Sequence, residues 1–179
     1  PHDSVDLALF INGLPVATAE LKTQTAGQSM ADAVEQYRAD RNPKDLIFAS
    51  RTVVHFAVDQ DAVAMTTKLE GRATRFLPFN QGSNGPGVDG GAGNPANPAG
   101  PRSAYLWEQV WARDTCLNLF ASYVHIETET TTDAKGRKRK TSTTVFPRYH
   151  QWDVVEKLLA RAKTDGPGHN KLVQHSAGS

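Results

Sequence analysis

The sequence has a single cysteine, Cys116, and no long hydrophobic run among its 179 residues. One cysteine excludes an internal disulfide and a CxxC zinc site, and without a signal peptide it predicts a protein of the reducing cytoplasm. No apolar stretch approaches the roughly 18 residues of a membrane-spanning helix, so no membrane partner is expected. The sequence also has no large excess of positive or negative charge, because it contains 20 lysines and arginines and 19 aspartates and glutamates. This balance excludes a uniformly basic surface, so any contact with nucleic acid must be local.

The hydrophobic pattern predicts a mixed α/β protein. The predicted strands are residues 5–11, 16–21, 46–49, 53–58 and 63–67, an edge segment at 75–79, hairpin arms at 124–132 and 140–145, and a buried strand at 171–175. The predicted helices are one of about 12 residues that begins at Ser29, one at 105–121 and one at 149–163. The second of these is expected to break near Asp114 and to turn Leu106, Val110 and Leu117 inward.

Residues 80–102 differ in composition from the chain on either side. Gly, Pro and Asn make up 15 of these 23 residues, and no periodicity is present. This composition predicts a loop or linker. We therefore expect a core domain in residues 1–79, a helical segment with a basic-tipped hairpin in 103–145, and the start of a second domain in 146–179. Both ends of the sequence indicate a piece of a longer protein.

The first predicted hairpin carries Asp6, Glu20 and Lys22. Glu20 and Lys22 are two residues apart on one strand, so their side chains share a face. A two-residue turn at Asn12-Gly13 would put Asp6 on the opposite face from Glu20. A loop of odd length or a β-bulge shifts the register by one and brings Asp6 opposite or diagonal to Glu20. A functional site here therefore predicts such a shift.

Two carboxylates that converge with a lysine suit Mg²⁺ and a phosphodiester. Carboxylate oxygens bind a hard cation, which polarises the phosphate and lowers the pKa of a bound water. The lysine would orient that water and offset the charge of the transition state. A Glu-x-Lys pattern is also common on exposed strands that have no catalytic role, so the pattern alone leaves both interpretations open.

Further residues place this pattern in a family. Asp6, thirteen intervening residues and Glu20-Leu21-Lys22, on a hairpin followed by a helix, resemble the PD-(D/E)xK nuclease motif. Residues 6–16 together with Glu20-Leu21-Lys22 closely resemble the restriction (R) subunit of type I restriction enzymes. Other stretches resemble the same family in the same order, namely 66–69, 76–80, 106–108, 146–151 and 174–179.

The resemblance implies a restriction-endonuclease-like fold, a mixed sheet flanked by helices, followed by the first elements of a RecA-like domain. It implies Mg²⁺-dependent cleavage of unmodified double-stranded DNA, coupled in the full protein to ATP-driven translocation. The implied partners are the methylation (M) and specificity (S) subunits, with target recognition carried out by the latter.

Carried over residue by residue, the resemblance makes Asp6 and Glu20 metal ligands and Lys22 the catalytic lysine. Gln36 matches the glutamine of the family's Q-x-x-x-Y motif, but the fourth residue beyond it is Asp40. Tyr37 is adjacent instead and lies on the apolar stripe of the predicted helix, so we expect it in the core. An acidic residue that the family uses upstream of the hairpin is expected to be lost or absent here.

The C-terminal residues resemble the beginning of a motor domain. Residues 146–151 resemble the Q-motif of superfamily 2 translocases, whose glutamine reads adenine, a task that suits an amide because it both donates and accepts. Residues 174–179 resemble the approach to a phosphate-binding loop, which a Gly-Lys-Ser/Thr completes in the family. The expected ATP-site remnants are Gln151, Ser176, Ala177, Gly178 and Ser179. The chain by itself is not expected to hydrolyse ATP.

One dense basic run contains five cations in six residues, namely Lys135, Arg137, Lys138, Arg139 and Lys140. It predicts either a solvated hairpin tip or a salt-sensitive contact with DNA phosphates. Two alternatives to an active R-subunit nuclease stay open. One is a helicase-associated DNA-binding module with a degenerate nuclease site, indicated by Asp40, and the other is a stand-alone repair nuclease.

Overall fold

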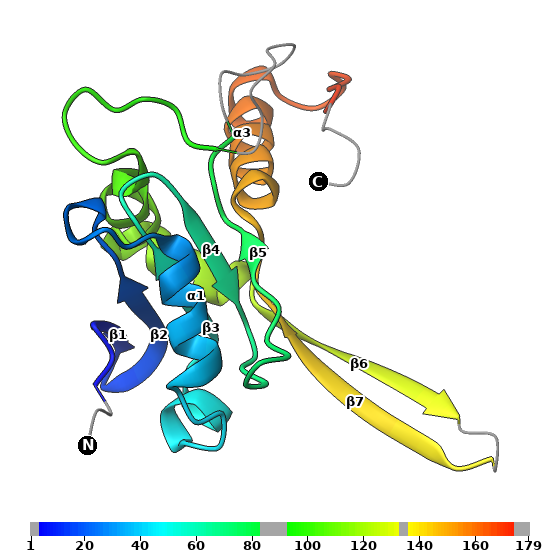
Figure 1. Ribbon diagram of the computed structural model, residues 1–179. Helices are drawn as coiled ribbons and strands as arrows, with labels where there is room; N and C mark the ends of the chain where they lie inside the picture. Colours follow the sequence, from blue (N-terminus) through cyan, green and yellow to red (C-terminus); the bar gives the residue numbers. More distant parts are fainter. Residues whose placement is uncertain (1–3, 83–92, 133–135, 174–179) are drawn as a thin grey trace.

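The computed structural model describes residues 4–82, 93–132 and 136–173. Its centre is a five-stranded mixed sheet in the order β1-β2-β3-β4-β5 (Figure 1). The strands are β1 (Leu7–Ile11), β2 (Leu14–Leu21), β3 (Val54–Val58), β4 (Val63–Thr66) and β5 (Leu77–Pro78). β2 and β3 are parallel, whereas the other neighbouring pairs are antiparallel. The predicted mixed α/β class is therefore confirmed.

Helix α1 (Met30–Ala39) forms the crossover between the parallel strands β2 and β3. The Asp32 carboxylate accepts hydrogen bonds from the Ser29 backbone N–H at 2.7 Å and from its hydroxyl at 3.0 Å. These bonds fix the first turn at the predicted position and hold the pKa of Asp32 below its usual value. Ala33, Val34 and Tyr37 are buried, so the predicted apolar stripe is the face that packs on the sheet.

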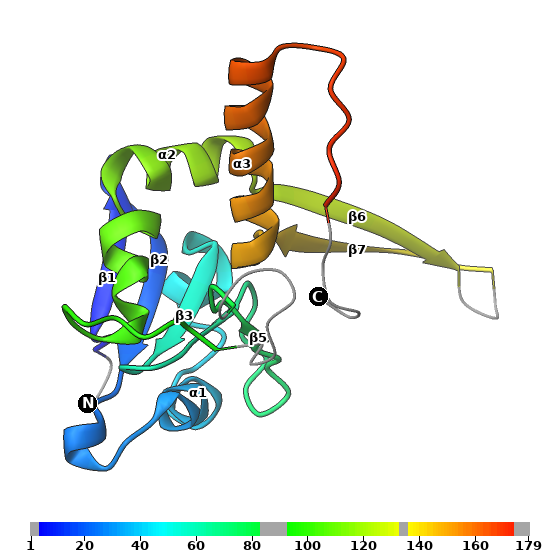
Figure 2. The ribbon, with the colours of Figure 1, turned by 90° about the horizontal axis from the view of Figure 1, so that it is seen from above.

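The sheet lies between α1 on one side and helices α2 (Arg113–Ser122) and α3 (Tyr149–Asp165) on the other (Figure 2). Because successive side chains of a strand point to opposite faces, β2 divides its residues between two environments. Ala17 and Ala19 belong to the main core, with Phe56, Leu106 and Trp152 among its other members. Thr18 and Glu20 point to the α1 side, where each bonds to a side chain of α1 or of the turn that follows it.

The strand predicted at residues 46–49 is wrong. Ile47–Arg51 form a short π-helical turn, in which Phe48 is the one buried residue. Its ring packs edge-on against Tyr37, with the ring centroids 6.4 Å apart. A short apolar run does not distinguish a strand from a helical turn. Here only Phe48 is buried, whereas a strand would bury alternate residues.

The helical segment after residue 104 breaks at Ala112, close to the predicted break near Asp114. Ala112 has an extended ψ of 135°, which separates α2 from the short π-helical turn Leu106–Val110. Leu106 and Val110 are buried as predicted, but the prediction for Leu117 is wrong, because it is 41% exposed and Leu119 is buried instead. Because the helix is interrupted at Ala112, the spacing of buried residues that begins at Leu106 does not continue into α2. Extending that spacing therefore predicts the wrong buried face of α2.

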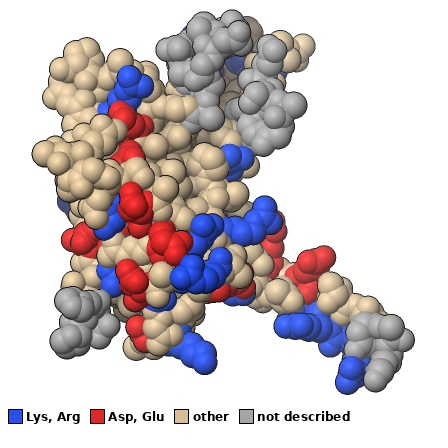
Figure 3. Space-filling model, viewed as in Figure 1, with Lys and Arg blue, Asp and Glu red and all other residues tan. Residues whose placement is uncertain are grey.

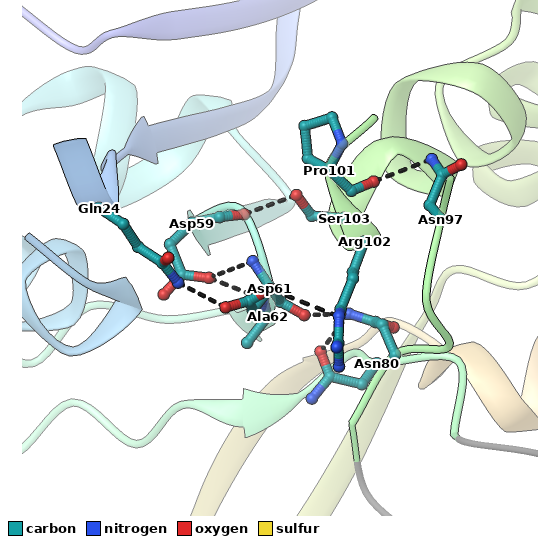
Figure 4. A network of polar contacts seen from close by, with 10 residues as sticks. Gln24, Asp59, Asp61, Ala62, Asn80, Asn97, Pro101, Arg102 and Ser103 are labelled. Atoms are coloured by element: carbon teal, nitrogen blue, oxygen red, sulfur yellow. Dashed lines mark hydrogen bonds and ion pairs between the residues drawn. The ribbon is translucent and has the colours of Figure 1, made fainter. Parts of the chain in front are cut away.

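The ends of segment 80–102 are tied to the turn between β3 and β4. The Asn94 side chain donates to the carbonyl oxygen of Asp61 at 2.8 Å and to Asn80 Oδ1 at 3.0 Å. The Ser103 hydroxyl donates to the carbonyl oxygen of Asp59, and Asp61 pairs with both Arg102 and Gln24 (Figure 4). The described residues of this segment before Arg102 contain no helix or strand, as predicted.

Asp59 joins this network to helix α1. Its carboxylate accepts the backbone N–H groups of Asp61 at 2.8 Å and Ala62 at 2.7 Å. The same carboxylate accepts the N–H of Met30, the first residue of α1, at 2.7 Å. One side chain thus fixes the β3–β4 turn and the start of α1 together.

The strand predicted at residues 171–175 is wrong in the part that the structure describes. Lys171–Val173 form no strand, and Leu172 is 92% exposed. Gln174 and His175 lie outside the described residues. A buried strand needs neighbouring strands, and the described residues provide none here. The described part of the chain therefore contains no RecA-like sheet. No helix within residues 4–82, 93–132 and 136–173 is both long and apolar enough to cross a membrane.

Candidate active site

A β-bulge in the first hairpin places Asp6 opposite Glu20. Next to the turn, Ile11 faces Leu14 and Phe10 faces Pro15, but Leu9 faces Ala17. Val16 is therefore an extra residue on β2, and it shifts the register by one for the rest of the hairpin.

The turn itself has two residues, Asn12 and Gly13, with φ of 50° and 80°. Glycine tolerates this left-handed conformation without cost, and asparagine tolerates it better than most residues. Beyond the bulge Leu7 faces Ala19, and the same register continued by one residue puts Asp6, just before β1, opposite Glu20. Asp6 also acts on the pKa of Glu20, so the two carboxylates are near each other. The predicted register shift is confirmed, and it arises from a bulge and not from an odd loop.

The two carboxylates of this pair have different surroundings. Asp6 is exposed, and its Oδ2 accepts the backbone N–H of Leu21 at 2.8 Å. Glu20 is fully buried, and its Oε1 accepts from Arg41 Nε at 2.7 Å. The other oxygen of Glu20, Oε2, is buried and has no hydrogen-bond partner.

Burial is the main cause that raises the pKa of Glu20 above its usual value, and the nearby charge of Asp6 acts in the same direction. Arg41 opposes this rise through its hydrogen bond and its charge. A raised pKa is what we expect of Glu20, because its Oε2 is buried without a partner and a second carboxylate lies nearby.

Arg41 is the site residue that the sequence interpretation missed. It is 7% exposed and follows α1, and its second nitrogen donates to the carbonyl oxygen of Ser4 at 2.7 Å. A signal was present in the sequence, because Arg41 continues the stripe of Ala33 and Tyr37 at intervals of four residues. A charged residue on a buried stripe requires an anionic partner inside the fold.

Lys22 and Gln36 are in direct contact, since Lys22 Nζ donates a hydrogen bond to Gln36 Oε1. Both side chains are half-buried, one just beyond the end of β2 and the other in the middle of α1. The backbone N–H of Lys22 donates to the carbonyl oxygen of Val58 at 2.8 Å, which ties it to β3. The structure therefore brings Asp6, Glu20, Lys22 and Gln36 to the α1 side of β2.

Tyr37 is a core residue, as predicted. It is fully buried, and its hydroxyl bonds to Thr18 Oγ1 at 2.8 Å. Thr18 also bonds to Nδ1 of the buried His55 at 2.7 Å. Burial lowers the pKa of His55 to about 4, so its ring is neutral at pH 7. Asp40, at the family's tyrosine position, is exposed at the end of α1.

The remaining predicted site residues lie away from this hairpin. Gln151 is exposed, and its side-chain oxygen accepts the backbone N–H of Arg148 at 2.9 Å, so in this structure it caps α3. Arg137 precedes β7 (Lys138–Val145), which contains the other three described cations of the basic run. The predicted residues outside the described ranges are Lys135, Ser176, Ala177, Gly178 and Ser179.

The mixed sheet, with one helix across its parallel pair of strands, is consistent with a nuclease-like α/β fold. Residues 1–74 match the family model of the type I restriction enzyme R protein N terminus, and this match supports an R subunit of type I restriction enzymes. The matched range contains the β1–β2 hairpin and α1. No curated protein and no solved structure matches the chain.

Proposed function

We propose that this chain contains the Mg²⁺-dependent endonuclease site of a type I R subunit, which cleaves unmodified double-stranded DNA during ATP-driven translocation. The observation that carries the proposal is the bulge at Val16. It turns Asp6 toward Glu20 on the face of β2 where Lys22 meets Gln36. The family match covers all four residues.

The donor set fits a magnesium ion. Glu20 offers a buried oxygen without a partner, and Asp6 offers a second carboxylate from the residue just before β1. Within the described residues, no group of three or more His, Cys, Asp or Glu side chains is arranged to hold a metal. Two carboxylates suit Mg²⁺, which usually keeps several waters and binds substrate phosphate. When bound, the ion would polarise the phosphodiester and lower the pKa of a water.

The chain's own residues supply position and charge. Gln36 holds the Lys22 ammonium, which would orient the attacking water and offset negative charge in the transition state. Arg41 occupies one oxygen of Glu20 and favours its ionised form. The other oxygen is left for the metal.

The wider assignment follows the family. We propose the M and S subunits as partners and ATP as the energy source of the full protein, with Gln151 and residues 176–179 at the edge of the nucleotide site. In the present fold Gln151 caps α3, so reading adenine would require it to exchange that bond for the base.

Plasmid cleavage tests the proposal. The full-length R subunit would be assembled with its partners, Mg²⁺ and ATP, and compared as wild type, Lys22→Ala and Lys44→Ala. Lys44 is an exposed lysine beyond α1 and serves as the matched control. We expect Lys22→Ala to lose about 10²–10³-fold in cleavage rate while its ATPase rate and the Lys44→Ala variant stay unchanged. Equal cleavage by both variants would exclude the nuclease assignment.

One observation favours a second candidate, a DNA-binding module with a degenerate nuclease site. Glu20 is fully buried and already paired with Arg41, which competes with a metal for its charge. This candidate predicts that Asp6→Asn changes neither cleavage nor DNA binding, whereas the nuclease proposal predicts that cleavage alone is lost.

A further inference from the structure

Strands β6 (His125–Thr132) and β7 (Lys138–Val145) form a two-stranded ribbon that projects from the body of the protein (Figure 1). They pair antiparallel from His125 with Val145 to Thr132 with Lys138. Within the described part of the chain, no other strand joins this sheet. All of β6 and most of β7 are exposed on both faces. An isolated two-stranded ribbon is marginally stable in water, so a surface that covers it would stabilise it.

The two faces of the ribbon differ in charge. Opposed residues share a face, so Lys138 and Lys140 lie on the side of their partners Thr132 and Thr130. We call this side the lysine face; its other members are Ile126, Thr128, Ser142 and Thr144. It contains two lysines, five hydroxyl side chains and no carboxylate.

The opposite side, the glutamate face, contains Glu127 and Glu129 with Arg139. Its remaining members are His125, Thr131, Thr141, Thr143 and Val145. The charges are also separated along the ribbon, because the cations of β7 pair with the last residues of β6. Figure 3 shows the basic side chains on the outer part of the ribbon and acidic ones nearer the body.

We infer that the lysine face is a sequence-neutral contact for the phosphate backbone of duplex DNA. The inference rests on the proposed function, in which DNA is the substrate. Lysines supply charge to phosphates, and threonine and serine hydroxyls donate hydrogen bonds to phosphate oxygens. A two-stranded ribbon is narrow enough to enter the major groove of B-DNA, which is about 12 Å wide.

The side chains of the lysine face argue against base recognition and against a protein partner. It contains no Arg, Asn or Gln, whose planar ends match base edges with two hydrogen bonds, and its two lysines are compact point charges that suit phosphates. Ile126 is its one large apolar side chain, whereas the centre of a protein interface is rich in aromatic and apolar groups. Both lysines are exposed, and within the described residues neither has an ion-pair partner.

The test measures DNA affinity as a function of salt with the full-length R subunit and a short duplex of arbitrary sequence, in EDTA. The variants are Lys138→Gln, Lys140→Gln, their double variant, and Arg139→Gln as a control with the same charge change on the other face. The slope of log affinity against log salt is negative, and each lysine variant should make it less steep by about 0.9, the double variant by about 1.8. Arg139→Gln should leave the slope unchanged.

Three results would overturn the inference. An unchanged slope in the double variant means that the face does not contact DNA. An equal reduction of the slope in Arg139→Gln means that the overall positive charge of the ribbon attracts DNA and that the lysine face is not a defined contact. A loss of binding to the M and S subunits with a normal slope would identify a protein contact and also overturn it. Because EDTA stops cleavage, the result is independent of the nuclease site, and Lys22→Ala should bind like the wild type.

Discussion

The ammonium group of Lys22 donates a hydrogen bond to the side-chain oxygen of Gln36, so β2 and α1 hold the lysine together. A lysine side chain has roughly 2 kcal/mol of rotamer entropy to lose when it is ordered. The contact with Gln36 orders it before any substrate arrives. If this arrangement serves catalysis, Gln36 acts as a positioning residue through Lys22.

Replacing Gln36 tests this role. We expect Gln36→Ala to slow plasmid cleavage by about tenfold, equivalent to about 1.4 kcal/mol, because Lys22 loses its fixed position. Gln28→Ala is the control, since Gln28 is exposed just before α1. The thermal unfolding midpoint of either variant should stay near that of the wild type. Cleavage at the wild-type rate by Gln36→Ala would show that the contact has no catalytic role.

The pair of Glu20 and Arg41 predicts a non-additive effect on stability. Arg41→Met leaves the Glu20 carboxylate buried without its partner and should cost about 3–5 kcal/mol of unfolding free energy. The double variant Glu20→Met/Arg41→Met removes both charges and should recover most of that loss. Chemical denaturation of the four proteins measures the coupling. Additive losses would mean that the pair is not desolvated as its burial indicates.

His55 predicts a loss of stability in acid. Burial lowers its pKa from 6.5 to about 4, so the unfolded chain binds the proton more readily than the folded one between these values. The stabilisation is complete above about pH 6.5 and is lost as the pH falls toward about 4. From this shift we expect a loss of about 3 kcal/mol.

His55→Asn retains a polar side chain that can bond to Thr18 and does not titrate, so its stability should depend less on pH in this range. The exposed His169 provides the control as His169→Gln, which should follow the wild type. Burial raises the pKa of Glu20, which works in the opposite sense, since that contribution falls as the pH rises. Glu20 is common to all three proteins, so the comparison between them isolates His55.

Tyr37 is predicted to act through packing alone. Tyr37→Phe removes the hydroxyl that bonds to Thr18 and should cost about 1 kcal/mol of stability. Cleavage should continue at the wild-type rate once the protein is folded. A large loss of cleavage with little loss of stability would instead give this tyrosine the role of the family's motif residue.

The sequence predicted the register shift of the first hairpin and most of the elements around it. The bulge at Val16 has no local signature, yet the need for Asp6 and Glu20 to share a face predicted a register shift. Arg41 was missed because its partner Glu20 is distant in sequence, and a single sequence does not reveal such pairs. The strand expected at residues 46–49 failed because periodicity over four residues does not distinguish a strand from a helical turn.

The prediction at residues 171–175 failed in its described part for a different reason. An apolar segment becomes a strand only when partners are present, and the described residues after α3 provide none. Leu172 is consequently exposed and not buried. A strand propensity is a property of a segment and its neighbours together.

The position of Asp59 also bears on how this protein tolerates change. Its carboxylate accepts hydrogen bonds from the start of α1 and from the β3–β4 turn, and its carbonyl oxygen accepts one from Ser103. The side chain of Asn94 donates hydrogen bonds to Asp61 and Asn80. An insertion between Gln81 and Asn94 would therefore lengthen the chain between two fixed points and would leave the β1–β2 hairpin in place. Extra loop length adds little entropic cost, so this is the segment where evolution, or an engineer, can add sequence at little cost to the candidate site.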